Sequence, residues 1–212
     1  MKAPAYDDKV WINNDRKLDG ICRDVLLAQD NGLNVLVVAH FDKSLTSFAA
    51  TLRERAIDFQ SFLAFDSKSL CEINPSDKAG KVRLALSSYF QADRFAAERR
   101  SERVALRTLV IEHHPLAVRD DSLLSSLSAL DCLSEISFHS ALTDPLLSHF
   151  GGEKIEGLLR RLGLAEEECV SHELISRAIR GAQDKISSQV KQDMQTQSAE
   201  DWFKYNLRER LW

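Results

Sequence analysis

A run of five apolar residues at 35–39 (VLVVA) constrains the fold more than any other segment of the chain. A strand without polar alternation suits a sheet that is covered on both faces, and parallel sheets are covered in this way. A helical pattern at 15–29 precedes the run, and Asn31-Gly32 is a typical helix stop between the two. The segment therefore predicts a helix followed by a buried parallel strand.

The alternation of helix and strand patterns continues along the chain to about residue 143. Further strands are predicted at 57–63, 81–86, 107–111 and 133–138. Further helices are predicted at 45–52, 92–106 and 120–130, the first of them capped by Asp42 or Ser44. This order predicts an α/β domain with a parallel sheet, flanking helices and right-handed crossovers.

The pattern becomes helical throughout after about Asp144. Asp144-Pro145 predicts a helix start, with aspartate as the cap and proline at the first helical position. Ser171 is predicted to cap a long helix whose apolar stripe reaches Met194, and a last helix is predicted at 200–211. We therefore predict an α/β domain at 1–143 and a helical extension at 144–212.

Composition and charge exclude several classes of protein. The net charge of -4 among 212 residues gives no general attraction to nucleic acid. No apolar run approaches the roughly 20 residues of a membrane-spanning helix, and the N-terminus lacks the apolar core of a secretion signal. Four scattered cysteines favour reduced, buried thiols over metal ligands or disulfides. These features predict a cytoplasmic protein without a metal.

Residues 112–129 resemble the last ATPase motif of SecA, the motor of bacterial protein export, which reads roughly E-R-H-E-S-R-R-I-D-N-Q-L-R-G-R-x-G-R. Glu112, His114, Asp120 and Leu123 are kept in register. Other stretches resemble the second motor domain of SecA and the start of the helices that follow it. They lie, in the order of the family, at 9–18, 34–45, 141–155, 161–164 and 175–185. The resemblance covers most of the chain.

The resemblance implies a RecA-like sheet domain of the helicase C-terminal type, followed by the start of the SecA scaffold. The family's catalytic arginines fall here on Ser126 and Ala129, and its Gly-Arg-Gly-Thr-Asp loop falls on 87–93 (SSYFQAD). An arginine finger contributes about 10³–10⁵-fold to phosphoryl transfer, and serine has no charge to replace it. The chain also lacks a Gly-x-x-x-x-Gly-Lys-Thr loop. The resemblance therefore predicts a pseudo-ATPase without catalytic residues and without a nucleotide cofactor.

Three further groups of residues are candidates for other roles. Glu112-His113-His114 could bind a metal or act as an acid–base pair, but a remnant of the family motif, with His114 holding a loop, is the favoured interpretation. Four arginines at helical spacing indicate a solvated face or a docking strip for an acidic partner, and three aromatic residues near the C-terminus indicate core packing or a partner surface. The candidate partner-binding residues are Arg99, Arg100, Arg103, Trp202, Phe203 and Trp212; Arg107 is the fourth arginine.

The favoured functional hypothesis is a non-catalytic, SecA-motor-like interaction or scaffold module linked to protein export. It implies a protein partner or self-association, with peripheral membrane contact by analogy with the family. The alternative is a nucleotide-dependent regulator, or an ATPase half-site that a partner's motor domain completes. A helicase-like nucleic-acid binder is a third hypothesis, and the acidic balance argues against it.

Overall fold

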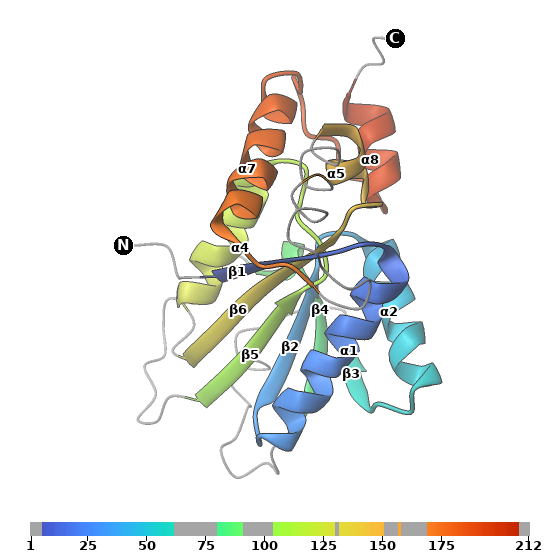
Figure 1. Ribbon diagram of the computed structural model, residues 1–212, viewed down its shortest axis with the longest axis vertical. Coiled ribbons are helices and arrows are strands. Elements are labelled where there is room, and N and C mark those ends of the chain that lie inside the picture. Colours follow the sequence, from blue (N-terminus) through green and yellow to red (C-terminus); the bar gives the residue numbers. More distant parts are fainter. Residues whose placement is uncertain are drawn as a thin grey trace.

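A six-stranded, all-parallel sheet forms the centre of the computed structural model (Figure 1), which describes residues 6–61, 80–90, 104–129, 132–150, 157 and 169–207. The strand order is β1-β6-β5-β2-β4-β3, and every pair of neighbours in it is parallel. The strands are β1 (Tyr6–Trp11), β2 (Asn34–Ala39), β3 (Phe59–Ser61), β4 (Val82–Leu86), β5 (Val104–Val110) and β6 (Cys132–Ala141). The prediction of a parallel α/β fold is confirmed.

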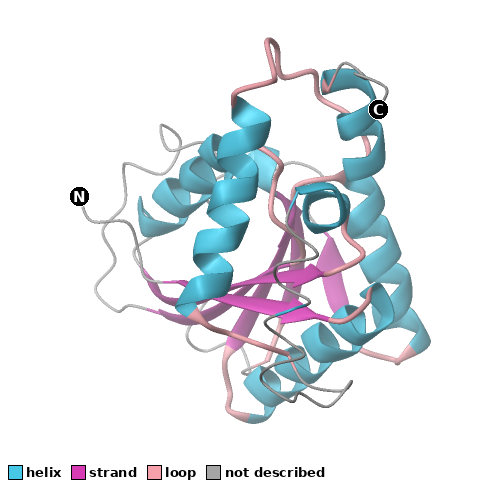
Figure 2. Cartoon of the chain, turned by 45° about the horizontal axis from the view of Figure 1, so that its top comes forward, coloured by secondary structure: helices cyan, strands magenta, loops and turns pink. Residues whose placement is uncertain are grey.

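Helices cover both faces of the sheet (Figure 2). They are α1 (Asn14–Asp30), α2 (Asp42–Glu54), the 3₁₀ turn η1 (Ser87–Tyr89), α4 (Ala117–Ala129), α5 (Pro145–Phe150), α7 (Glu173–Ser187) and α8 (Ala199–Asn206). Alternate residues of β2 enter different cores: Val35 and Val37 pack with α1 and α2, whereas Leu36 and Val38 pack with α4. This arrangement is the physical reason for the continuous apolar run in β2.

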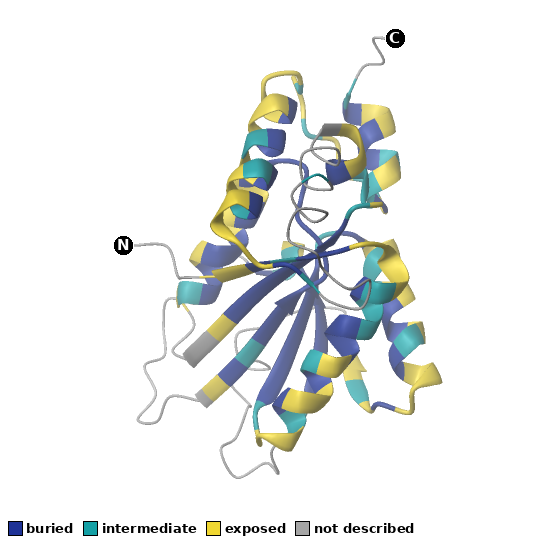
Figure 3. Ribbon diagram, viewed as in Figure 1, coloured by how far each residue is buried: buried dark blue, intermediate teal, exposed yellow. Residues whose placement is uncertain are grey.

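A third core lies beyond the carboxyl edge of the sheet, under α5, α7 and α8 (Figure 3). Ile175, Ile179 and Trp202 from the tail are buried there together with Phe41 and Leu116, which follow β2 and β5. The helical tail therefore packs against the same edge of the sheet at which the loops of a parallel α/β domain gather. The division at 143/144 stays a prediction.

Strand β1 was not predicted, because its first residues are polar and its apolar part is short. Tyr6 to Trp11 pair in parallel with Ile136 to Ala141 of β6, so β1 is an edge strand. A polar, half-solvated edge strand gives a weaker sequence signal than a central strand such as β2. Val10 forms an additional antiparallel bridge with Val170, through two hydrogen bonds of 2.9 and 3.0 Å.

Several predicted boundaries are wrong, and three concern the helices predicted at 92–106 and after Ser171. The helix predicted at 92–106 overlaps the start of β5, and its part before residue 104 lies outside the described residues. The helix α7 begins after His172, whose Nδ1 accepts from the Leu174 N–H, while Ser171 bonds to Asp7 instead. It also ends at Ser187, well before Met194. At the start of α7, the local cap at His172 and the contact of Ser171 with Asp7 replace the cap that the sequence pattern indicated.

Replacing Gly20 with alanine is expected to destabilise the fold by about 1–3 kcal/mol. A Cβ at this position of α1 would overlap the six-membered ring of Trp11. The ring is buried and stacks on His139 at 6.1 Å between centroids, so it has little freedom to move aside. Urea denaturation measures the change.

Gly181→Ala in α7 is the control, because no neighbouring atom lies within 4 Å of the added methyl group. This variant should be more stable by up to about 1 kcal/mol. Equal effects of the two substitutions would refute the clash at Gly20.

Candidate functional site

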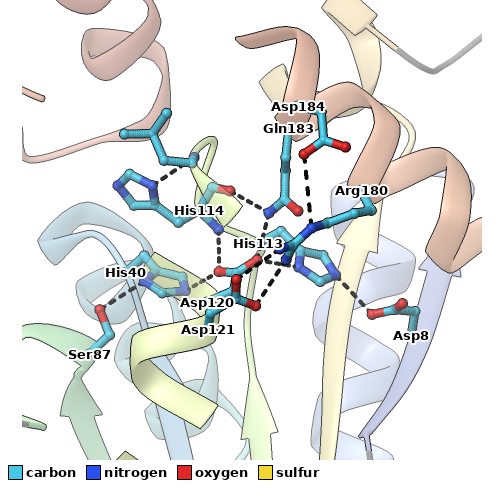
Figure 4. Close-up of polar contacts among 11 residues, drawn as sticks. Asp8, His40, Ser87, His113, His114, Asp120, Asp121, Arg180, Gln183 and Asp184 are labelled. Carbon is cyan, nitrogen blue, oxygen red and sulfur yellow. Dashed lines mark hydrogen bonds and ion pairs between the residues drawn. The ribbon is translucent and has the colours of Figure 1, made fainter. Parts of the chain in front are cut away.

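A cluster of buried polar side chains lies at the carboxyl edge of the sheet (Figure 4), the edge at which open parallel sheets bind ligands. We call it the edge cluster. Its members come from β1, α4, α7 and the segments that follow β2, β4 and β5. They are Asp8, His40, Ser87, Glu112, His113, His114, Asp120 and Gln183. The parallel topology brings these side chains together although they are far apart in sequence. Asp8 and Gln183, for example, are separated by 175 positions.

Asp120 is the centre of the edge cluster. Its Oδ2 accepts from His113 Nδ1 at 2.7 Å and from Gln183 Nε2 at 2.6 Å. Its Oδ1 accepts from the His114 N–H at 2.9 Å and lies 2.8 Å from His40 Nε2. Asp120 is kept from the family motif, and here its carboxylate is surrounded by partners from within the chain.

His113 forms a buried ionic triad with two carboxylates. Its Nε2 lies 2.9 Å from Asp8 Oδ1, and its Nδ1 faces Asp120. Burial alone would lower the pKa of His113, but the charge of Asp120 and hydrogen bonds to Asp120 and Asp8 raise it to about 10. Burial disfavours the Asp120 carboxylate too, yet the charge of His113 and the hydrogen bond from His113 hold its pKa well below the usual range. His113 is thus an imidazolium between two carboxylates.

His114 holds the loop between β5 and α4. Its Nδ1 accepts from the Leu116 N–H at 3.0 Å, and its carbonyl oxygen accepts from Gln183 Nε2 at 2.8 Å. Its ring lies against Phe41 and Trp202, both at 5.5 Å between centroids. Burial lowers the pKa of His114 to about 3. The neutral ring therefore joins the loop to the third core.

The free energy of unfolding is expected to fall as the pH drops below about 6.5, the pKa of histidine in an unfolded chain. His114 keeps a pKa near 3 in the fold, and burial also lowers the pKa of His139, so as the pH falls the unfolded chain binds extra protons at both sites and acid favours unfolding. One such proton contributes about 1.4 kcal/mol per pH unit. Urea denaturation at pH 7, 6 and 5 measures the slope. His114→Asn keeps an acceptor near the Leu116 N–H and should reduce the slope by about one proton; an unchanged slope contradicts this assignment.

Glu112, which is remote in sequence, caps the N-terminus of α2. Its Oε1 accepts from the His40 N–H at 2.9 Å and from the Phe41 N–H at 3.2 Å. The predicted cap, Asp42 or Ser44, is wrong, because Phe41 is the N-cap and forms no side-chain cap bond. Burial raises the pKa of Glu112, while Lys17 and a hydrogen bond from Ser44 oppose the rise. A carboxylate from the β5 loop therefore takes the place of a local cap.

Ser126 and Ala129, which the sequence resemblance aligns with arginines, have different surroundings. Ser126 is buried, and its Oγ donates to the carbonyls of Ser122 and Phe90, at 3.0 and 3.3 Å. Ala129 is exposed in the last turn of α4. In the part of the chain that the structure describes, no group of three histidine, cysteine or acidic side chains is arranged to hold a metal ion. The same residues include no helix long and apolar enough to cross a membrane.

The candidate partner-binding aromatics are packed inside the chain where the structure describes them. Trp202 is fully buried in the third core, and its Nε1 donates to Asp193 Oδ1 at 2.8 Å. Phe203 is 7% exposed in the same core, and a partner-binding role for the two rings stays a prediction. Arg107 lies on β5, where its Nη1 donates to Glu135 at 3.0 Å, and not on a helical stripe. The remaining candidates, Arg99, Arg100, Arg103 and Trp212, lie outside the described residues.

The chain resembles protein translocase subunit SecA from several bacteria. It is 26% identical to SecA of Clostridium beijerinckii and of Oleidesulfovibrio alaskensis over 181 residues, which are 84% of this chain and 21% of each relative. With SecA of Syntrophus aciditrophicus the identity is 34% over 92 residues, 43% of this chain and 11% of the relative. The chain thus spans about a fifth of the length of the relatives that match it over most of its own length. No protein-family model matches it.

Two solved structures are similar in outline. The C-terminal domain of a possible DNA helicase from Lactobacillus strain WCFS1 has a TM-score of 0.40 at 10% identity, covering 66% of this chain and 76% of that one. The C-terminal part of the Fun30 ATPase domain has a TM-score of 0.42 at 12% identity, covering 81% of this chain and 54% of that one. The recognition made from the motifs is confirmed by the sequence likeness: over most of its length, the chain with this all-parallel sheet is similar to SecA.

Proposed function

We propose that this chain is a SecA-motor-like protein that does not hydrolyse ATP and that acts as an interaction or scaffold module linked to protein export. One observation carries the proposal: the chain's own side chains fill the ligand-binding edge of its sheet. Gln183 reaches from α7 to Asp120 and to the His114 carbonyl, and Arg180 pairs with Asp121 beside them at 2.8 Å. A nucleotide at this edge would have to displace α7 from the third core.

The charges at the edge also disfavour a triphosphate. The imidazolium of His113 is neutralised by two carboxylates, and Lys17 is paired with Asp144 at 2.8 Å. Ser126 donates its hydroxyl to backbone carbonyls and carries no charge. Phosphoryl transfer depends on cations that neutralise the γ-phosphate, and the described part of this edge presents buried carboxylates instead. This excess of buried carboxylates over available cations supports the proposal that the chain does not hydrolyse ATP.

The link to export rests on the SecA likeness, which covers 84% of this chain. The partner we propose is a cytoplasmic component of a protein translocase or a second copy of the chain. Sedimentation velocity of the chain alone tests self-association, and size-exclusion chromatography with purified translocase components tests the second route. A monomer that co-elutes with none of these components would refute the interaction module.

Titration of the chain with Mg²⁺-ATP is expected to give no heat of binding, no shift in Tm and no phosphate release above buffer. Purified SecA serves as the positive control. The competing hypothesis, a half-site completed by a partner, requires binding to emerge when a separate first motor domain of SecA is added. ATP turnover by the chain that disappears in Glu112→Gln would overturn the proposal, and ATP binding that exists only in the mixture would favour the half-site.

A further inference from the structure

Within the edge cluster, Ser87 contacts His40, and His40 in turn contacts Asp120 (Figure 4). Ser87 Oγ lies 2.8 Å from His40 Nδ1, and His40 Nε2 lies 2.8 Å from Asp120 Oδ1. Each imidazole nitrogen therefore faces one of the other two groups. This is the order of contacts in which a base activates a hydroxyl while a carboxylate orients the base.

The three residues come from separate parts of the fold that the parallel sheet brings to one edge. Ser87 follows β4, His40 follows β2, and Asp120 lies in the first turn of α4. The side chain of His40 is only 1% exposed, whereas Ser87 is half-buried and its neighbour Ser88 is exposed. Ser87 is thus a partly exposed residue next to the exposed Ser88, beside a buried imidazole.

The protonation states also fit this arrangement. Asp120 is ionised: burial disfavours its carboxylate, but the charge of His113 and the hydrogen bond from His113 hold its pKa well below the usual range. An ionised Asp120 beside Nε2 favours the His40 tautomer with its proton on Nε2, which leaves Nδ1 as the acceptor for Ser87. His40 Nε2 lies 2.8 Å from Asp120 Oδ1 but forms no hydrogen bond of standard geometry, so this contact is a close approach and not a formed hydrogen bond. Such contacts often tighten only when a substrate binds.

We propose that Ser87 is a nucleophile toward small, activated carboxylic esters, with His40 as its general base and Asp120 as the residue that positions His40. The inference goes beyond the interaction module and does not rest on it, because neither the partner surface nor ATP is involved.

The reaction has two balanced steps. In the first, Ser87 Oγ forms a bond to the acyl carbon while its proton moves to His40 Nδ1; the bond to the leaving alcohol then breaks, and that alcohol takes the proton from His40. In the second, a water molecule gives its proton to His40 and attacks the acyl-serine, and Ser87 recovers the proton as the carboxylic acid leaves. Asp120 keeps its negative charge throughout and faces the imidazolium at Nε2.

The test uses p-nitrophenyl acetate as the substrate and a fluorophosphonate as the covalent probe, both with the full chain. Wild-type protein is expected to release p-nitrophenol above the buffer rate and to carry the probe on Ser87, located by peptide mass spectrometry. Ser87→Ala should abolish both, whereas Ser88→Ala, the exposed neighbour, should retain both. His40→Gln should slow labelling by about 100-fold or more, the usual contribution of a general base.

Each result decides the proposal. Circular dichroism and Tm are recorded for every variant, and His40→Asn replaces His40→Gln if the latter does not fold. Labelling on another residue, or equal rates in wild type and Ser87→Ala, overturns the assignment of the nucleophile. A labelling rate that does not change in a folded His40 variant overturns the role of the base. Neither result would affect the proposed interaction module, whose tests are sedimentation and chromatography.

Discussion

Replacing Asp120 with alanine is expected to lower the free energy of unfolding by about 3–5 kcal/mol, the usual cost of removing one partner from a buried ionic network. The change would leave the His113 imidazolium with Asp8 alone and would remove the acceptor of the His114 N–H and of one Gln183 N–H. His113, His114 and Gln183 are all buried, so water cannot readily replace the lost carboxylate. Urea denaturation at pH 7, followed by circular dichroism, measures the difference.

The neighbouring residue provides the control. Asp121 is exposed and pairs with Arg180 on the surface at 2.8 Å, and pairs of this kind contribute about 0–1 kcal/mol. Asp121→Ala should therefore change the free energy of unfolding by less than about 1 kcal/mol. If the two alanine variants were equally stable, Asp120 would not be the centre of the network. A probe-binding experiment with Asp120→Ala would be uninformative until its folded fraction is known.

Replacing Trp202 with alanine is expected to destabilise the chain by a similar amount, about 3–5 kcal/mol. The indole is fully buried and contacts the rings of Phe203 and His114, at 5.4 and 5.5 Å between centroids. Its loss would open a cavity where the tail meets the β5 loop, and it would also remove the hydrogen bond to Asp193. Thermal and urea denaturation of the variant measure the effect.

Tyr205 on the same helix is the matched control for Trp202. It is 55% exposed, so Tyr205→Ala should change the stability by about 0.5 kcal/mol or less. The result also separates two uses of the C-terminal aromatics. A Trp202→Ala variant that is as stable as the wild type would mean that the indole does not stabilise the core. Trp202 would then be a candidate for binding a partner.

The central part of the fold could be predicted from local patterns. The continuous apolar run of β2 predicted its place inside a sheet covered on both faces, and Asn31-Gly32 ended α1 where Gly32 has a φ of 73°. The Asp144-Pro145 start of α5 was predicted equally well. These signals are short-range: a buried strand, a left-handed glycine and a helical proline each reveal their conformation through a few adjacent residues.

The edge cluster could be predicted only in part. The motif singled out Glu112, His114 and Asp120, but it did not show that Glu112 caps α2 or that Gln183 closes the cluster from α7. Ser87 was noted only as part of a loop without arginines, and His40 only as part of a motif stretch. Contacts between residues so far apart have no periodicity, so they become visible only when the sheet places the strand ends together.

The pairing of β1 with β6 has a consequence for the order in which the protein forms. Tyr6 lies opposite Ile136, so during synthesis β1 waits for about 130 further residues before its partner strand is made. The bridge from Val10 to Val170 closes later still. We therefore expect β2, β4 and β5 to assemble first during synthesis, and β1 to remain an unpaired ribbon, open to chaperones, until the C-terminal half has emerged.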